Sequence, residues 1–147
     1  MEIEKNAGRG RILALDVGKK RIGLALSDPL FITAQGLPTL QRTTIREDLA
    51  TLKELTEERG VSLLLVGYPL HMSGDESRQS VYTRDFAERL VDRVGLPVRF
   101  WDERMTSVEA GRVLKQSGIS IDKRAKAVDQ MSAVILLSSY LDAGCPA

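Results

Sequence analysis

The pattern of hydrophobic and polar residues predicts five short β-strands. The two first segments are rich in apolar side chains, and Val17-Gly18-Lys19-Lys20 between them is typical of a tight hairpin turn. The fourth segment, VSLLLV, is almost entirely apolar, which indicates a central strand covered on both faces. We expect the strands at residues 11–16, 21–27, somewhere within 31–40, 61–66 and 98–101.

Helical spacing predicts four helices between and after these strands. Thr44 and Glu47 have the spacing of a capping box, apolar residues then recur at helical intervals, and Gly60 is placed to end the helix. Thr106 and Glu109 repeat the capping-box spacing. The other helices are expected at residues 77–94, from Thr106 to about 118, and at residues 125–141.

This order of elements predicts an α/β fold. Three strands in a meander are followed by strand–helix–strand crossovers and two final helices. Such an order gives one mixed sheet with helices on its faces. The chain shows no repeat, no low-complexity block and no linker, so we expect a single domain over residues 1–147. Phe86, Phe100 and Trp101 are expected in its core.

The composition indicates a globular protein but does not indicate which ligand it binds. The hydrophobic fraction is 43% and the charged fraction 28%, values typical of a globular chain. Cys145 is the only cysteine, so no internal disulfide can form. No apolar run approaches membrane-spanning length and the start of the chain has no secretion signal, so we expect a cytoplasmic protein with no membrane partner. The net charge of +1 neither favours nor excludes nucleic acid.

Three acidic residues from distant parts of the chain are the candidates for chemistry. Asp16 ends the first strand, Glu103 follows the last strand beside Asp102, and Asp129 borders the apolar stripe of the final helix. Sites in open α/β sheets form where strands end. Each acid alone also fits an ordinary role: Asp16 as a turn residue, Glu103 as a partner of Arg104, and Asp129 as a solvated helix residue.

Carboxylates that converge in one place suit divalent cations. Metal ions held by carboxylates are a common means of cutting phosphodiester bonds. Mg²⁺ prefers oxygen ligands and few protein contacts, so we expect Mg²⁺ or Mn²⁺ if the three acids meet. Spacing alone does not show that they do.

Four motifs, taken in order, resemble the YqgF/RuvX family. Together they span residues 11 to about 140, and the set in this order is highly specific. The motifs are Leu15-Asp16-Val17-Gly18 with Arg21-Ile22-Gly23-Leu24-Ala25, then Val66-Gly67-Tyr68-Pro69-Leu70, Asp102-Glu103-Arg104-Met105-Thr106-Ser107 and Val128-Asp129-Gln130-Met131-Ser132-Ala133.

The resemblance implies a ribonuclease H-like fold with a five-stranded mixed sheet and a nuclease activity. Members of the family are thought to trim the 5′ end of precursor 16S rRNA during ribosome biogenesis, and some have been proposed as Holliday-junction resolvases. The family's acidic positions correspond to Asp16, Glu103 and Asp129, which are thereby the expected catalytic and metal-binding residues. Related nucleases often keep an acid at the end of the central strand. This chain has Gly67 there, so Glu103 or Asp102 must supply that ligand.

Basic residues near each acid are candidates for binding the nucleic-acid backbone. Two further side chains could stack on an unpaired base. The alternative for all of them is an ordinary solvated or structural role, including for His71, which stands where the family loop usually carries asparagine. The candidates are Lys19, Lys20, Arg21, Arg104, Lys126, Tyr68 and His71.

Several functions compete at this point. A metal-dependent ribonuclease acting on precursor rRNA comes first, and a structure-selective DNA endonuclease on four-way junctions comes second. The latter needs two symmetric sites and hence a dimer, whereas the sequence indicates a monomer or a weak homodimer. An actin-like ATPase shares the Asp-x-Gly turn, but 147 residues leave no room for its second lobe. A catalytically dead binding module would have lost one of the acids.

Overall fold

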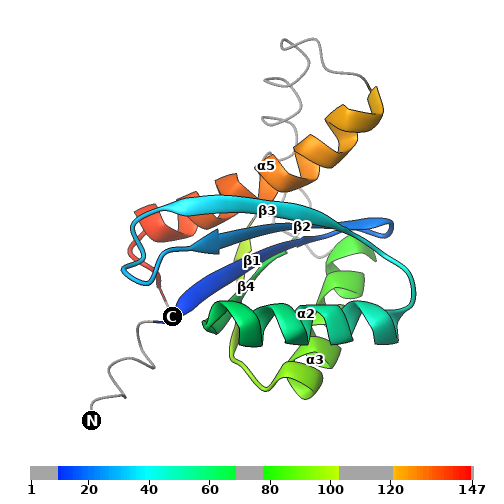
Figure 1. Cartoon of the computed structure of the whole chain (residues 1–147), viewed down its shortest axis with the longest axis horizontal. Helices are drawn as coiled ribbons and strands as arrows, with labels where there is room; N and C mark the ends of the chain where they lie inside the picture. Colours follow the sequence, from blue (N-terminus) through cyan, green and yellow to red (C-terminus); the bar gives the residue numbers. More distant parts are fainter. Residues whose placement is uncertain (1–9, 69–77, 103–120, 147) are drawn as a thin grey trace.

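A five-stranded mixed sheet forms the centre of the molecule (Figure 1). The computed structural model describes residues 10–68, 78–102 and 121–146. The strand order is β3-β2-β1-β4-β5, with β1, β2 and β3 antiparallel and with β4 parallel to both β1 and β5. This arrangement confirms the predicted fold class. The strands are β1 (Arg11–Val17), β2 (Arg21–Ser27), β3 (Ala34–Gln41), β4 (Val61–Tyr68) and β5 (Val98–Asp102).

Helices cover both faces of this sheet. Helices α2 (Ile45–Arg59) and α3 (Arg78–Val94) lie on one face, and α5 (Ile121–Asp142) crosses the other (Figure 1). No helix among the described residues is long and apolar enough to cross a membrane. The predicted helix that starts at Thr106 lies outside the described residues.

The alternation of side chains along the strands divides the core into two layers. In β1, Leu13 and Leu15 are fully buried on the side of α2 and α3. Ile12 and Ala14 are fully buried against α5. The two layers explain why the central strands are apolar at nearly every position, and the same alternation decides on which face each functional side chain lies.

Local signals set the limits of α2 as predicted. The Thr44 hydroxyl accepts the N–H of Glu47 at 3.1 Å, and Gly60 closes the helix in the left-handed conformation with φ of 65°. The Glu47 carboxylate accepts the hydroxyl of Thr43 at 2.7 Å, so the second half of the expected capping box takes a different partner.

Several element boundaries and the burial of one aromatic residue differ from the predictions. Strand β4 continues through Tyr68, because pairing of Tyr68 with Asp102 on β5 extends it past Gly67. Helix α5 begins at Ile121, earlier than residue 125. Phe100 is 42% exposed because β5 is an edge strand, whereas Phe86 is buried as expected.

Candidate active site

Asp16 lies near the end of β1 on the face that α5 covers. Its neighbours at alternate positions, Ile12 and Ala14, pack in the layer beneath α5, and strand alternation puts Asp16 on the same side. Asp16 pairs across the antiparallel ladder with Gly23 of β2. Directly opposed residues share a face of the sheet, so the missing side chain of Gly23 leaves space beside Asp16.

Helix α5 occupies the space above Gly23. An ideal Cβ atom at Gly23 would lie 2.0 Å from the carbonyl oxygen and 3.3 Å from the Cα of Asp129. Cβ positions of a directly opposed pair are about 4.5–5.5 Å apart. Asp16 and Asp129 are therefore near neighbours, although more than a hundred residues separate them in the chain.

A second glycine also lets helix α5 pack closely against the sheet. Gly36 of β3 pairs with Ala25 of β2. A Cβ atom at Gly36 would lie 2.8 Å from Cγ of Gln130, whose side-chain amide donates to the carbonyl of Leu37 at 2.7 Å. The two glycines thus let residues 129 and 130 approach adjacent strands closely, which fixes where along the sheet Asp129 sits.

The carboxylate of Asp129 pairs with Arg21, the first residue of β2. Nε of Arg21 donates to Oδ2 of Asp129 at 2.7 Å, and the side chains are 28% and 24% exposed. Arg21 lies two positions before Gly23 on β2, so it shares the face of Asp16. Asp16, Arg21 and Asp129 therefore lie on the same face of the sheet, over the β1–β2 hairpin.

The third predicted acid, Glu103, lies outside the described residues, directly after β5. Asp102 is the last residue of β5 and is exposed. It pairs with Tyr68, and strand alternation puts it on the face opposite to Trp101, which packs in the layer under α5. Asp102 is thus directed away from the face that carries Asp16 and Asp129.

A family model shows to which group of proteins the chain belongs. The model described as RuvX, Holliday junction resolvase, matches residues 10–143. The chain belongs to the RuvX family. The predicted enzyme class, a hydrolase that cuts phosphodiester bonds, follows from this membership.

Individual relatives of this RuvX-family protein agree with the match. A protein of Koribacter versatilis is 52% identical over 139 residues, which cover 95% of this chain and 91% of the relative. A protein of Moorella thermoacetica is 51% identical over 132 residues, which cover 90% and 94%. Both carry the name "Putative pre-16S rRNA nuclease".

A solved structure shows the fold class. Thermus thermophilus RuvC in complex with a Holliday junction substrate superposes with a TM-score of 0.56 at 13% identity, covering 92% of this chain and 97% of that chain. At this identity the similarity concerns the fold alone. The RuvX-family chain is ribonuclease H-like, as its motifs predicted.

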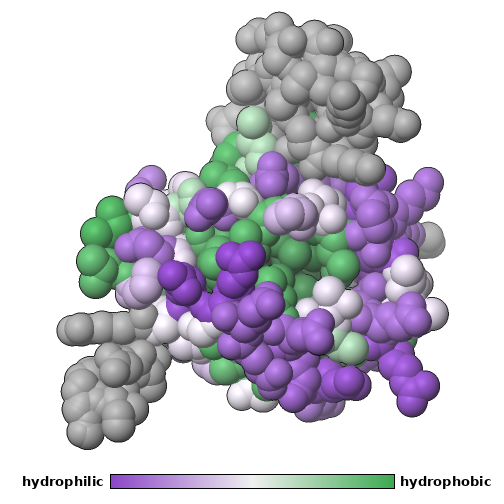
Figure 2. All heavy atoms as spheres, viewed as in Figure 1, coloured by the Kyte–Doolittle hydropathy of each residue, from purple (hydrophilic) through white to green (hydrophobic). Residues whose placement is uncertain are grey.

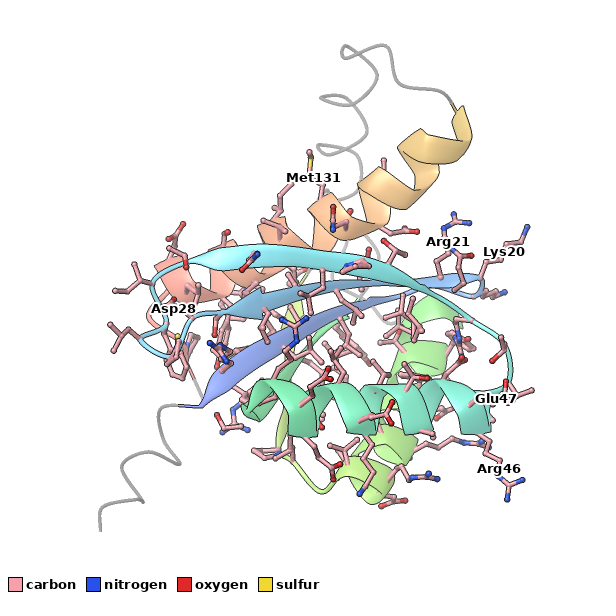
Figure 3. The ribbon with its side chains drawn as sticks, viewed as in Figure 1. Lys20, Arg21, Asp28, Arg46, Glu47 and Met131 are labelled. Carbon is pink, nitrogen blue, oxygen red and sulfur yellow. The ribbon has the colours of Figure 1, made fainter. Side chains whose placement is uncertain are left out.

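The predicted nucleic-acid contacts separate into two groups. Lys19 and Lys20 are exposed in the β1–β2 turn, and Lys20 and Arg21 project from its tip (Figure 3). Hydrophilic side chains dominate this end of the molecule, over the turn and the start of α2 (Figure 2). Arg104 and His71 lie outside the described residues, as does the side chain of Lys126.

Tyr68 lies on the face of the sheet opposite to Asp16 and Asp129. Its ring contacts Phe100 with centroids 5.0 Å apart, and its hydroxyl accepts from Nη1 of Arg84 on α3 at 3.4 Å. These contacts belong to the face covered by α2 and α3. A base stacked on Tyr68 would therefore lie on the face of the sheet opposite to Asp16.

The acids that the structure does describe match the chemistry of a hard divalent cation. Asp16 and Asp129 offer oxygen donors, the type that Mg²⁺ and Mn²⁺ prefer. Within the described part of the chain, no group of three or more metal-binding side chains forms. Mg²⁺ commonly uses one or two carboxylates and keeps several waters, so this pair fits the predicted cofactor.

The two glycines against which α5 packs were not identified by the sequence analysis. Gly23 and Gly36 stand inside strands, where glycine weakens β-structure and often marks a close approach of another backbone. That signal was present in the sequence, but the segment that approaches could not be known. Arg42, which no motif singled out, donates to the carbonyl of Gly18 in the turn beside this site.

Proposed function

We propose that this RuvX-family protein is a metal-dependent nuclease that processes the 5′ end of precursor 16S rRNA. The observation that carries the proposal is the close approach of the Asp129 backbone to Gly23, the residue that pairs with Asp16. The names of its relatives support the choice of substrate. Asp16, Asp129 and Glu103 are the residues that we assign to hold Mg²⁺ or Mn²⁺.

The bound cation would supply an activated water and neutralise charge on the leaving oxygen. The protein's own part is to hold the carboxylates in place. Asp16 is fixed by the β1–β2 ladder, and Asp129 is fixed by the contact of its backbone with Gly23. Arg21 orients the Asp129 carboxylate through Oδ2 and adds positive charge beside the scissile phosphate.

The exposed turn supplies the first contacts with the substrate. Lys19 and Lys20 are exposed and lie within four residues of Asp16. Lysines at such a position bind backbone phosphates without regard to sequence, and their contribution falls as salt rises. Recognition of a particular precursor end would then come from the shape of the RNA and from residues elsewhere on the surface.

Resolution of four-way DNA junctions is the second candidate. The description of the family model favours it, since that description names a Holliday junction resolvase. Such an enzyme cuts two strands symmetrically and requires a dimer. The oligomeric state of the protein therefore separates the two candidates as clearly as the substrate does.

The decisive experiment compares two substrates under one condition. Purified protein is incubated with an RNA that contains the 5′ precursor sequence of 16S rRNA, and separately with a synthetic four-way junction, at equal salt and in 5′-end-labelled form. Mg²⁺, Mn²⁺ and excess chelator are compared for each substrate. The Asp16→Asn and Asp129→Asn variants are the matched controls, because each keeps the shape of the side chain.

We expect cleavage of the precursor RNA that needs a divalent cation and disappears in both variants. Cleavage of the junction alone, by a dimer, would replace the first candidate with the second. Cleavage that persists in chelator, or in Asp16→Asn, would refute the metal mechanism for either substrate.

A further inference from the structure

Arg42 follows β3 and reaches back to the β1–β2 turn. Its side chain is 10% exposed. The backbone N–H of Arg42 donates to the carbonyl of Lys20 at 3.0 Å, and Nη1 donates to the carbonyl of Gly18 at 2.9 Å. One residue therefore binds two carbonyl groups of the turn.

The guanidinium of Arg42 is itself held by both helices of that face. Nε donates to Oδ2 of Asp48 in the first turn of α2 at 2.9 Å, and the Asp48 side chain is 2% exposed. The guanidinium also donates to the hydroxyl of Tyr82 on α3 and lies 5.0 Å from the centre of the Phe86 ring. These contacts leave the side chain of Arg42 little freedom to move.

The other carboxylate oxygen of Asp48 binds the backbone next to Arg42. Oδ1 accepts the backbone N–H of Thr43 at 3.0 Å, so the carboxylate joins the side chain of Arg42 to the backbone that follows it. A planar guanidinium presents several donors in fixed directions, which the single ammonium of lysine does not reproduce. The geometry of the pair is thus specific to arginine.

The turn that Arg42 holds connects two residues of the candidate site. Gly18 N–H donates to the carbonyl of Arg21 at 2.9 Å and closes the turn. Asp16 lies two residues before Gly18, and Arg21, the partner of Asp129, lies at the other end. A change in the conformation of the turn would therefore change the position of Asp16 relative to Arg21.

A buried ion pair contributes little net stability compared with apolar residues of the same shape. Apolar side chains could join α2 to α3 equally well, but they could not donate to the carbonyl of Gly18. The hydrogen bond to the Gly18 carbonyl therefore explains why an arginine stands at this position. We propose that Arg42, oriented by Asp48, is a positioning residue. It holds the β1–β2 turn so that Asp16 and Arg21 keep their positions relative to Asp129.

This proposal rests on the proposed function for its catalytic meaning, and it predicts effects that can be measured without substrate. In Arg42→Lys the charge remains but the bond to the Gly18 carbonyl is lost. We expect the amides of residues 18–21 to exchange faster with deuterium. We also expect the affinity for Mn²⁺ alone, measured by calorimetry, to fall by roughly tenfold, as when the support of a metal ligand is removed.

The control is Leu52→Ala, which creates a cavity at a fully buried residue of α2 and removes no hydrogen bond. It lowers the melting temperature and leaves the bonds of Arg42 to the turn in place, so we expect Mn²⁺ affinity and turn exchange to stay at wild-type values. If Arg42→Lys fails to fold, Asp48→Asn serves instead, because it keeps an acceptor for Arg42 while weakening the pair. Its effect on Mn²⁺ affinity should be in the same direction and smaller.

Unchanged turn exchange and unchanged Mn²⁺ affinity in a folded Arg42 or Asp48 variant would overturn the positioning role. So would losses in Leu52→Ala that match those in Arg42→Lys, since both would then follow general stability. Wild-type protein that binds no Mn²⁺ would refute the proposed function instead, and the exchange of the turn amides would still decide whether Arg42 holds the turn.

Discussion

Replacing Gly23 with alanine tests the contact that brings Asp129 to the sheet. A Cβ atom there would lie 2.0 Å from the carbonyl oxygen of Asp129 and 2.6 Å from its carbonyl carbon. Real Cβ atoms essentially never come within 3.0 Å of another heavy atom, so the helix or the strand must move by at least about 1.0 Å. Because the obstructing atoms belong to the backbone, no side-chain rotation relieves the clash.

The expected effects on stability and on catalysis differ in size. Overpacking by one methyl group costs about 1–3 kcal/mol, which a domain of ordinary stability tolerates. A displacement of about 1 Å at a catalytic group lowers the rate by about 100-fold. We therefore expect Gly23→Ala to remain folded and to lose cleavage activity far beyond what its melting temperature would explain.

Gly36→Ala is the matched control on the next strand. A Cβ atom there meets the side chain of Gln130, at 2.8 Å from Cγ and 2.9 Å from Cδ. This side chain can rotate away, at the cost of its hydrogen bond to the Leu37 carbonyl. Such a bond is worth about 1 kcal/mol, so the cleavage rate should change by less than roughly tenfold.

Both variants are assayed by single-turnover cleavage of the precursor RNA in Mg²⁺, with thermal unfolding followed by circular dichroism in the same buffer. Wild-type activity in Gly23→Ala would show that the contact between α5 and β2 does not position Asp129. Equal losses of activity in the two alanine variants would refute the distinction between backbone and side-chain obstruction.

Three further predictions concern single groups. Asp16→Asn should abolish cleavage while the melting temperature stays near that of the wild type, because a half-exposed carboxylate adds little to the core; residual activity measured with end-labelled RNA would contradict this. Replacing both Lys19 and Lys20 with alanine should raise KM and reduce the slope of log KM against log salt by about 1–2; an unchanged slope would exclude them as phosphate contacts. Backbone N–H groups, that of Thr33 first, hold the pKa of Asp28 below its ordinary value of 3.8. The stability that this carboxylate adds is therefore present above pH 3.8 and is lost as the pH falls through the lowered pKa. Melting curves of the wild type and Asp28→Asn should therefore differ above pH 3.8 and converge in more acidic buffer, and a difference independent of pH would refute the assignment.

Local chemistry made much of the fold predictable from the sequence. The hairpin of β1 and β2 follows from two apolar segments around a short turn, and α2 begins and ends at Thr44 and Gly60, where its capping residues stand. The apolar run at 61–66 predicted a central strand, and the sheet order confirms it. The end of β4 could not be predicted, because its last residues are held by pairing with β5.

The sequence by itself determined which side chains are the candidates for chemistry, since the family motifs single out Asp16, Glu103 and Asp129 and their order is specific. Only the tertiary structure decided that Asp16 and Asp129 lie on one face of the sheet, beside Gly23. Packing of α5 against the bare backbone of Gly23, and the bond from Arg21 to Asp129, depend on contacts between segments more than a hundred residues apart. No local pattern encodes such a contact, because a glycine shows that something approaches closely but not which segment it is.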